Sequence, residues 1–438
     1  MLDIHFIEKN KEILKEVIKK KKIPLDLEKL LYFNEKRKAL LKKIEALRHQ
    51  RNLNIKEIEK RRKEKKDFKD LIEKGKAHKK EISKNEKELK EILEKYNELL
   101  LLVPNVFAPE VPIGDESKNK IVKKWGKIPE FDFKVKSHIE LGEKLDLLDL
   151  KEGAKVSGFR GYFLKNEGVL MHLGVLWLGV KKLLEKGFQL FLPPTLVREF
   201  VLFGSGHFPL GKEDIYQIAN PGKLESGEDI KEKIYLVGTS EPSLLGYFAK
   251  KTFREKDLPI KVCGISQCYR SEVGSYGKDT KGLFRVHEFA KVEQVIICKN
   301  DIQESNFWLE KLRENAEELL QELEIPYRVV LVASEEMGYG KYKMYDIECF
   351  IPSQGKYRET HSDSNLTDWQ ARRLQIKYKT KTGKTFFCHT LNNTMIASPR
   401  ILIPLWEINQ TKEGFIKVPK VLRKFVGKEI IKNSQKRK

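Results

Sequence analysis

The chain has 438 residues, of which 40% are hydrophobic and 34% charged, so it has enough apolar sequence for two or three folded domains and is not a wholly disordered protein. Its 86 lysines and arginines exceed its 64 aspartates and glutamates, which gives a net charge of +22. This surplus favours a polyanionic partner, nucleic acid before a membrane, although lysine-rich codon usage would produce the same charge.

The N-terminal sequence MLDIHFIEKNKEIL lacks the long apolar run and the small-residue cleavage site of a secretory signal. Five cysteines in a chain of this length exclude a disulfide scaffold, and no CxxC pair marks a zinc site. The longest apolar stretch, residues 168–180, is too short to cross a bilayer and includes a histidine. We therefore expect a cytoplasmic protein with reduced thiols and no membrane segment.

Residues 1–104 are predicted to form a helical-hairpin arm. Apolar residues recur there at spacings of three and four, which is typical of a coiled-coil seam. The two stretches with this spacing are Phe33, Leu40, Ile44, Leu47 and Ile58, and later Leu89, Ile92, Tyr96, Leu99 and Val103. Arg51 and Asn54 occupy seam positions in the first stretch. Two such helices can bury their narrow stripes only against each other, so we expect an antiparallel pair with its turn near residues 64–80, where Gly75 lies.

The arm carries a basic run that includes Lys60, Arg61, Arg62, Lys63, Lys65 and Lys66. A charge run of this kind is usually a solvated face, and the arm could be a spacer or a dimerisation coil. A long basic projection is also suited to grip a folded nucleic acid through its phosphates, independently of base sequence.

Residues 105–130 contain several prolines and are predicted to be a linker with one short strand. Residues 131–438 have a mixed pattern that predicts an α+β domain. Helices are expected at 171–186, 241–256 and 301–323. Strands are expected at 260–270, 291–299, 327–333, 344–352 and 384–391. Turn signals close to the strands favour an antiparallel sheet over a doubly wound parallel one.

Common nucleotide-binding and hydrolytic motifs do not occur in the chain: there is no P-loop, no complete GxGxxG, no GxSxG, no HExxH and no kinase motif set. A nucleotide would have to be held in another way. The segment YRSEVGS, a hydrophilic loop and LFRVHEFAKVEQV form a strand–loop–strand pattern that places Arg270, Glu272, Glu288 and Glu293 on one sheet. Alternation predicts that Arg270 shares a face with Glu272, and Val286 with Glu288.

Two further segments add polar residues to this constellation. KYRETHSDSN follows a strand, and HTLNNTMIASPRILIPLWEINQ reads as a strand end, a polar turn and an apolar helix carrying Arg400. Arginine suits phosphate oxygens, and Glu359 and Ser362 are hard oxygen ligands of the kind that Mg²⁺ prefers. A free amino acid needs a carboxylate for its ammonium group and polar partners for its side chain, which Glu293, Thr239, Glu241, Asn392 and Thr394 could supply. Each of these residues by itself is more typical of an ordinary structural ion pair or hydrogen bond.

At these residues the sequence resembles the seryl-tRNA synthetases, which are class II aminoacyl-tRNA synthetases. The likeness runs nearly end to end: the opening, the arm at 27–103, the segment at 138–164, KGFQLFLPPTLVRE with Pro194 as motif 1, YRSEVGSYGKDTKGLFRVHEF as motif 2, NNTMIASPRILIPLWE as motif 3, and the element Thr239-Ser240-Glu241. Motif 2 together with this element and RETHSDSN is the specific part. The resemblance implies an antiparallel sheet flanked by helices, preceded by an N-terminal antiparallel coiled-coil arm that binds tRNA.

The resemblance also implies a reaction. Serine attacks the α-phosphate of ATP to give seryl-adenylate, and the acyl group then passes to tRNA(Ser). The implied catalytic residues are Arg270 at the α-phosphate and Arg400 at the γ-phosphate. The implied serine-binding residues are Thr239, Ser240, Glu241, Arg270, Glu293, Asn392 and Thr394. The implied ATP-binding residues are Arg270, Ser271, Glu272, Val286, His287, Glu288, Phe289, Glu359, Thr360, His361, Ser362 and Arg400. Phe289 would stack on adenine, and Glu359 and Ser362 would hold Mg²⁺.

By the same resemblance the protein would be a homodimer built on motif 1; whether it also charges tRNA(Sec) stays open. The sequence departs from the family's usual pattern at Tyr269, His361 and Asp363, but none of these changes removes a charged catalytic residue. Two alternative functions predict different features. A paralogue that loads a carrier protein would lack the long arm, and a non-catalytic nucleic-acid-binding protein would show damage in motif 2 or 3 and no stabilisation by serine with ATP.

Overall fold

The computed structural model describes residues 1–273, 279 and 281–432. The chain divides into two units, Met1–Pro104 and Asn105–Lys438. The first contains the short helices α1 (Ile4–Lys9) and α2 (Lys11–Lys20) and the long helices α3 (Leu27–Lys63) and α4 (Lys69–Leu102). Asp26 begins α3 by accepting a hydrogen bond from the Lys29 amide at 3.0 Å, which satisfies one of the free N–H groups of the first turn.

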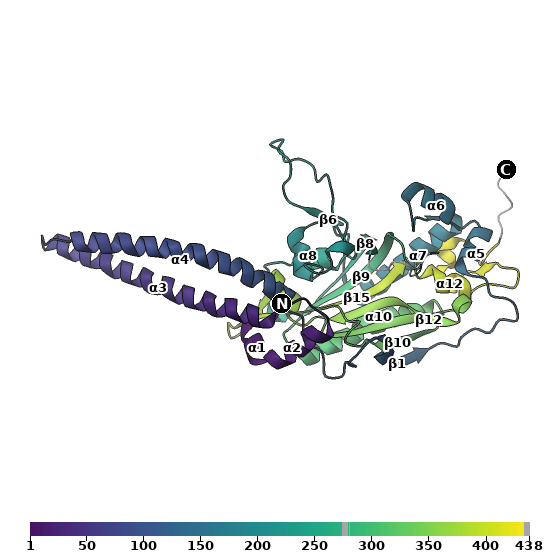
Figure 1. The fold of residues 1–438 in the computed structure, drawn as a ribbon. Helices are drawn as coiled ribbons and strands as arrows, with labels where there is room; N and C mark the ends of the chain where they lie inside the picture. The colour runs from purple at the N-terminus through teal and green to yellow at the C-terminus, as the bar shows by residue number, and fades with distance from the viewer. Residues whose placement is uncertain (274–278, 280, 433–438) are drawn as a thin grey trace. The chain divides into compact units, whose positions relative to one another are not determined.

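Helices α3 and α4 lie side by side as an antiparallel pair (Figure 1). A narrow stripe of buried residues joins them: Phe33, Ile44, Leu47, Ile82, Ile92 and Tyr96. The ion pairs Lys43–Glu81 (2.9 Å) and Arg48–Glu86 (2.7 Å) connect the two helices beside this stripe. The predicted coiled-coil hairpin is confirmed, with its turn at residues 64–68, so Gly75 lies inside α4 and not in the turn.

An eight-stranded sheet forms the centre of the second unit, in the order β1-β10-β11-β12-β15-β9-β8-β4. The strands in this order are β1 (Lys120–Trp125), β10 (Tyr327–Leu331), β11 (Lys343–Ile351), β12 (Lys356–Asn365), β15 (His389–Ser398), β9 (Glu288–Cys298), β8 (Ile260–Tyr269) and β4 (Gln189–Phe191). Neighbours are antiparallel except β4 and β8, which are parallel. The predicted antiparallel α+β sheet is confirmed.

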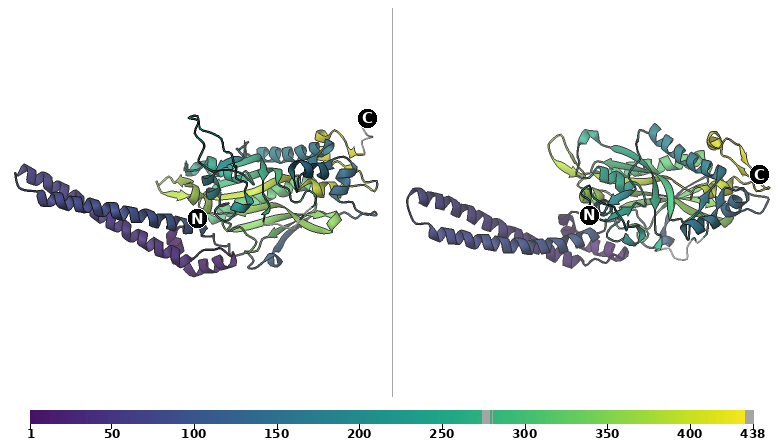
Figure 2. Two further views of the ribbon diagram at one scale, coloured as in Figure 1. Left: turned by 45° about the horizontal axis from the view of Figure 1, so that its top comes forward. Right: turned by 90° about the horizontal axis from the view of Figure 1, so that it is seen from above.

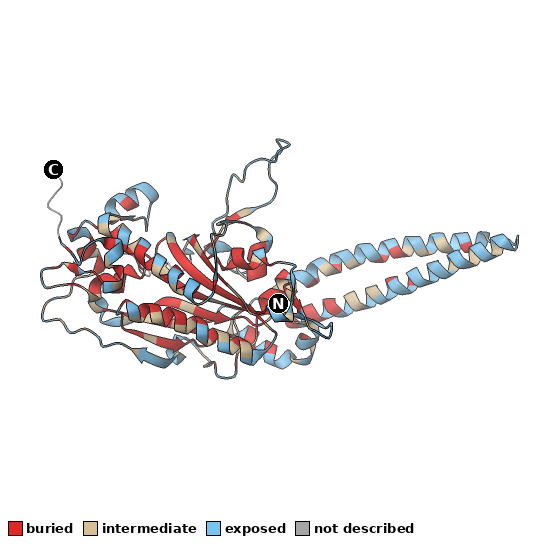
Figure 3. Ribbon diagram, turned by 180° about the vertical axis from the view of Figure 1, so that it is seen from behind, coloured by how far each residue is buried: buried red, intermediate tan, exposed pale blue. Residues whose placement is uncertain are grey.

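Helices α7 (Asn166–Glu185) and α10 (Ile302–Glu322) pack on the sheet over strands β9, β12 and β15 (Figures 1 and 2). The main hydrophobic core lies at this interface, where Val175, Leu312 and Leu319 meet Val292 and Ile296. Figure 3 shows buried residues concentrated in the sheet and its covering helices, whereas the long arm helices are mostly exposed.

Smaller elements surround the sheet. The helices are α5 (His138–Lys144), α6 (Leu150–Ser157), α8 (Glu199–Ser205), α9 (Glu241–Tyr247), α11 (Trp369–Leu374), α12 (Leu402–Ile408) and α13 (Arg423–Val426). The strands are β2 (Leu148–Asp149), β3 (Phe163–Leu164), β5 (Leu196–Arg198), β6 (Ile234–Leu236), β7 (Thr252–Arg254), β13 (Lys377–Lys379), β14 (Thr385–Phe387), β16 (Ile416–Lys417) and β17 (Ile430–Ile431).

Several local predictions were wrong. The helix expected at 241–256 ends at Tyr247, and residues 252–254 form β7, which pairs in parallel with β13. The strand expected at 384–391 is divided between β14 and β15, which belong to different sheets. The segment Asn392–Met395, expected to be a polar turn, lies within β15 because it pairs with β9. The short strand expected within residues 105–130 is present as β1, which pairs with β10 at the edge of the sheet, and these residues belong to the second unit.

Strands β12 and β15 form only a short ladder, through Asp363–Asn393, Ser364–Asn392 and Asn365–Leu391. The rest of β12 pairs with β11, and the rest of β15 pairs with β9. The two central strands are therefore not paired with each other over residues 356–362 of β12 and 394–398 of β15. Polar side chains on both strands can face a space there, because the backbones are not held at ladder distance.

None of the helices in the described part of the chain combines the length and apolarity needed to span a membrane. Helix α7, which carries the longest apolar stretch, is instead a core helix with Met171, Val175 and Leu183 fully buried. The five cysteines are buried free thiols.

Candidate active site

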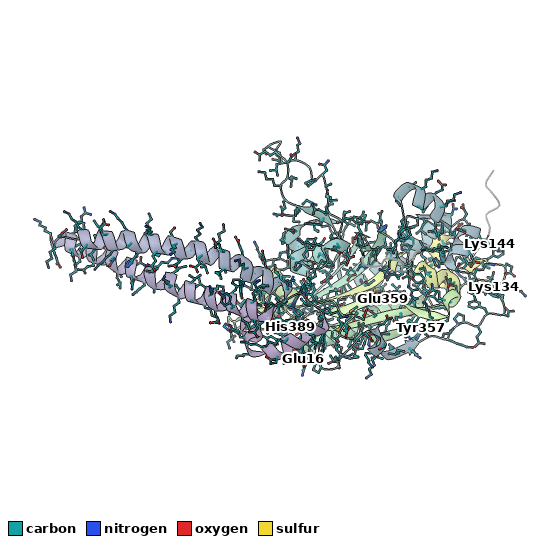
Figure 4. All side chains as sticks on the ribbon, viewed as in Figure 1. Glu16, Lys134, Lys144, Tyr357, Glu359 and His389 are labelled. Carbon is teal, nitrogen blue, oxygen red and sulfur yellow. The ribbon has the colours of Figure 1, made fainter. Side chains whose placement is uncertain are left out.

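A cavity of about 370 Å³ opens where β12 and β15 diverge. Most of the predicted site residues line it: Thr239, Glu241, Arg270, Glu272, Val286, Phe289, Glu293, Glu359, Thr360, Ser362, Asn392, Thr394 and Arg400. These residues come from β9, β12, β15, the first residue of α9 and the loops after β6, β8 and β15. Glu359 is labelled on its strand in Figure 4. Tertiary structure thus brings together side chains that are up to 161 positions apart in the sequence.

Five predicted residues lie outside this lining: Ser240, Ser271, His287, Glu288 and His361. Ser240 is buried and donates to the Gly264 carbonyl at 3.4 Å, and Ser271 donates to the Glu213 carbonyl. His361 is buried, and its Nδ1 is 2.8 Å from the Thr360 hydroxyl. Each of these side chains is engaged with the protein itself.

His287 and Glu288 face a different space. They line a second cavity of about 420 Å³ together with Tyr162, Tyr216 and Tyr269. The expectation that Val286 and Glu288 share a face was wrong, because β9 begins only at Glu288 and strict alternation does not extend before the strand. Within β9, Phe289, Lys291 and Glu293 face the first cavity, whereas Ala290 and Val292 belong to the core.

Two arginines in the first cavity have no acidic partner. Arg270 Nε donates to the Gly238 carbonyl at 3.2 Å, and its guanidinium lies 5.3 Å from the centre of the Phe289 ring. Arg400 Nε donates to the Phe284 carbonyl at 3.0 Å, and Nη1 to the Glu359 carbonyl at 3.4 Å. Burial lowers the pKa of Arg400. Neither guanidinium forms an ion pair with any described carboxylate, so both are available to an anion in the cavity.

Neighbouring arginines differ in this respect. Arg285 Nη1 lies 2.7 Å from Glu272 Oε2, and Arg358 Nη2 lies 2.7 Å from both carboxylate oxygens of Asp279. These two guanidinium groups are already neutralised. The contrast singles out Arg270 and Arg400 as the phosphate-binding candidates.

A second group of lining residues is buried and includes two carboxylates, Glu241 and Glu293. Lys291 Nζ lies 2.6 Å from Glu293 Oε2, beside the Thr394 hydroxyl. Glu241 Oε1 accepts hydrogen bonds from Gln370 Nε2 at 2.5 Å and from Asn392 Nδ2 at 3.0 Å. Burial raises the pKa of Glu241 to about 7, and the negative charge of Glu293 adds to the effect. This subsite has the groups that a small zwitterion with a polar side chain requires.

Glu359 and Ser362 project into the cavity from one strand and offer oxygen atoms only. Asp346 pairs with Ser362 in the ladder, and its Oδ1 is buried without a hydrogen-bond partner. Burial raises the pKa of Asp346 well above its ordinary range, and the charge of Glu359 acts in the same direction. A hard cation would relieve this accumulation of oxygens, so the donor set fits Mg²⁺. In the described residues, no group of three or more His, Cys, Asp or Glu could hold a metal ion, so Mg²⁺ here would depend on Glu359, the Ser362 hydroxyl and the substrate phosphates.

The sequence prediction missed several lining residues. Lys291 could have been found, since it lies two positions from Phe289 and from Glu293 in a strand. His207, Tyr339 and Lys341 come from loops that carry no local signal. The pKa of His207 is lowered to about 4 by burial and by the nearby charge of Arg270, so this histidine is neutral at physiological pH.

Comparison with known proteins accounts for the whole chain. Residues 1–107 match the seryl-tRNA synthetase N-terminal domain, and residues 223–409 match the tRNA synthetase class II core domain (G, H, P, S and T). A serine–tRNA ligase of Deinococcus radiodurans is 42% identical over 98% of both chains, and that of Pyrococcus horikoshii is 41% identical over 98% of both.

Solved structures agree with these sequence matches. The crystal structure of seryl-tRNA synthetase from Pyrococcus horikoshii complexed with ATP has a TM-score of 0.88 and 40% identity, covering 99% of this chain and 100% of that one. The cytoplasmic serine–tRNA ligase of Naegleria fowleri in complex with AMP has a TM-score of 0.83 and 31% identity, covering 97% and 96%. With an arm, a class II sheet and full-length similarity all in place, the chain belongs to the seryl-tRNA synthetase family.

Proposed function

We propose that the protein joins L-serine to tRNA(Ser) in two steps, with ATP as the energy source and seryl-adenylate as the intermediate, for protein synthesis. The observation that carries this proposal is the pairing, in one cavity, of two arginines without acidic partners and a buried subsite of carboxylates and hydroxyls. The full-length similarity to serine–tRNA ligases supports the same assignment.

In the first step, a carboxylate oxygen of serine attacks the α-phosphorus of ATP, and pyrophosphate leaves. No enzyme nucleophile is required, so the protein contributes alignment and charge neutralisation. Arg270 would hold the α-phosphate and the attacking carboxylate, and Arg400 would hold the γ-phosphate. Phe289 would stack on adenine, and Val286 would contact the base. Because Nε of each arginine donates a hydrogen bond to a backbone carbonyl, the guanidinium planes are oriented before ATP binds.

Glu359 and Ser362 would hold Mg²⁺, which when bound neutralises negative charge on the phosphates. Glu359 lies on β12, and its backbone carbonyl accepts a hydrogen bond from the Arg400 guanidinium. Glu359 would therefore contribute to the site in two ways, with its side chain as a ligand that would hold Mg²⁺ and with its carbonyl as a support for Arg400.

Serine recognition would depend on Thr239, Glu241, Glu293, Asn392 and Thr394. The carboxylate of Glu241 would receive the substrate ammonium, while Glu293 and Thr394 would meet the hydroxyl. A site that leaves such buried groups unpaired rejects alanine strongly, and the enclosed volume excludes larger amino acids.

In the second step, a hydroxyl of the terminal ribose of tRNA attacks the acyl carbon, and AMP leaves. We propose that residues 1–104 are the tRNA-binding arm and that residues 131–438 are the catalytic domain. We further propose a homodimer and a cytoplasmic location; charging of tRNA(Sec) is a question for the same assay.

Wild-type protein is expected to charge total tRNA with serine and with no other amino acid, and to exchange pyrophosphate into ATP only when serine is present. Both assays should be run with Mg²⁺ and with chelator. Charging with a different amino acid, or exchange without any amino acid, would contradict the proposal.

The buried carboxyl of Glu241 predicts a pH dependence. Its pKa of about 7 means that it is mostly protonated at pH 6 and ionised at pH 8. Only the ionised form receives the serine ammonium. The kcat/KM for serine should therefore rise about tenfold between pH 6 and pH 8 and then level off. Glu241→Gln should give a lower, flat profile in pyrophosphate exchange.

In the absence of serine, the free energy of unfolding should change with pH in the opposite direction to kcat/KM. The folded-state pKa of Glu241 is raised from 4.5, so the folded protein holds a proton that the unfolded chain releases. This contribution to the free energy of unfolding is present below pH 4.5 and is lost as pH rises through about 7. Comparing the melting temperature of the wild type with that of Glu241→Gln across this range measures it; parallel curves would contradict it.

A further inference from the structure

A lysine and a glutamate form a buried ion pair in the wall of the amino-acid subsite. Lys291 Nζ lies 2.6 Å from Glu293 Oε2, and the two side chains are only 6% and 2% exposed. Both project from β9 on the same face, two positions apart. The Thr394 hydroxyl, opposite Glu293 in the ladder, is 3.5 Å from the ammonium and 3.4 Å from the carboxylate. All three groups line the cavity.

Stability alone does not account for this pair. Burying two charges costs desolvation free energy that their attraction often fails to recover, and apolar residues of similar size serve a core as well or better. Val292, Val295 and Ile296 of the same strand are fully buried apolar residues, and the buried polar Gln294 is uncharged. A charged pair retained at the cavity wall therefore suggests a requirement of the site.

The two carboxylates of the subsite have different partners. Glu241 is bonded to the amide side chains of Gln370 and Asn392, which are neutral. Glu293 is paired with a cation. A carboxylate beside an ammonium has one oxygen fixed in place and its charge balanced, whereas the Glu241 carboxylate has no cation in contact among the described residues. Glu293 is therefore suited to accept a hydrogen bond from a neutral group, because its charge is already balanced.

On the basis of the proposed function, we infer that Lys291 is a positioning residue for amino-acid discrimination: it holds the Glu293 carboxylate in place, beside Thr394, as the acceptor for the hydroxyl of the substrate. An amino acid without that hydroxyl, such as alanine, would leave the buried acceptor without a hydrogen-bond donor. The free-energy cost of that unpaired group is the reason why the site should reject alanine strongly. Removing the ammonium group would leave the Glu293 carboxylate without the contact that fixes it beside Thr394, so it would no longer be held where the substrate hydroxyl can reach it.

The test compares Lys291→Met with wild type in pyrophosphate exchange with serine and with alanine. The kcat/KM for serine is expected to fall about 100-fold, mainly through KM, and the preference for serine over alanine to fall at least about tenfold. The KM for ATP should change less than about threefold, because Lys291 has no role at the phosphates. A merely structural role would weaken both substrates together and would leave the serine-to-alanine ratio unchanged.

Two further variants separate positioning from folding. Lys291→Met/Glu293→Gln leaves no unpaired charge, so it should fold even where the single variant does not, and it should still show the lost preference for serine. Lys343→Met is the matched control, since Lys343 on β11 is 7% exposed, pairs with Glu110 at 2.8 Å and lies outside the cavity lining. Lys343→Met is expected to lower the melting temperature without altering the serine-to-alanine ratio.

The outcomes are distinguishable. If wild type prefers serine but folded Lys291→Met keeps the wild-type serine-to-alanine ratio, the role of Lys291 is refuted while the proposed function stands. If only the double variant folds and it keeps that ratio, Glu293 is not the acceptor and the role of Lys291 is refuted with it. If wild type does not activate serine at all, the proposed function fails and the inference fails with it. Loss of preference in both Lys291 variants, with normal preference in Lys343→Met, supports the inference.

Discussion

Replacement of Arg270 by alanine is expected to reduce serine-dependent pyrophosphate exchange roughly 10³-fold. The guanidinium lines the cavity without a carboxylate partner, and its Nε is held by the Gly238 carbonyl at 3.2 Å. In the proposed reaction it contacts both the α-phosphate and the attacking carboxylate, so its loss removes alignment and charge neutralisation together. Arg270→Lys keeps the charge but loses the planar fork, and should recover only part of the rate.

Arg254→Ala is a suitable control, because Arg254 is 72% exposed in its ion pair with Asp257 and lies outside the cavity. Its exchange rate should equal that of wild type. Isothermal titration with ATP would show whether Arg270→Ala still binds nucleotide, which separates a chemical defect from misfolding. Unimpaired exchange in Arg270→Ala would refute the phosphate role.

Shortening the arm should separate the two steps of the reaction. Deleting residues 51–80 and joining Gln50 to Glu81 through a short Gly-Ser turn removes about 20 Å from the hairpin. Of the buried residues of α3 and α4 it removes only Leu71, so the remaining helices should still pair. Pyrophosphate exchange should stay within about twofold of wild type, while kcat/KM for tRNA charging should fall at least about 100-fold, because phosphate contacts along the arm supply affinity.

A milder variant tests the electrostatic part of this argument. Lys60, Arg62 and Lys63 are exposed, so reversing their charges leaves the seam intact. This variant should raise the KM for tRNA about tenfold and flatten its dependence on salt, with exchange unchanged. Full charging activity in the shortened protein would show that the arm is a spacer.

Local sequence patterns were sufficient where structure follows from neighbours in the chain. The three-and-four spacing of Phe33, Ile44 and Leu47 predicted the arm, because a narrow apolar stripe on a helix has few partners other than a second helix. The runs at 260–270 and 344–352 predicted β8 and β11 closely. Local pattern failed at Asn392–Met395, where polar composition suggested a turn but pairing with β9 imposed a strand.

The assembly of the site depends on contacts between residues that are far apart in the sequence. Glu288 and Glu293 lie in one strand, yet they face different cavities, because successive side chains of a strand alternate between faces and a shift of one residue exchanges them. Only the register of β9 against β8 and β15 determines which residue points inward. His207 and Lys341 likewise reach the cavity because distant loops are brought to it.

By itself, therefore, the sequence determined the helical arm and the antiparallel domain, since periodicity is a property of local sequence, and its motifs pointed to 13 of the 28 residues that line the cavity. The tertiary structure decided which arginines are free of carboxylate partners, where β12 and β15 separate, and that Lys291 is paired with Glu293. Those features depend on the distances between residues remote in the chain, and packing and strand register set these distances.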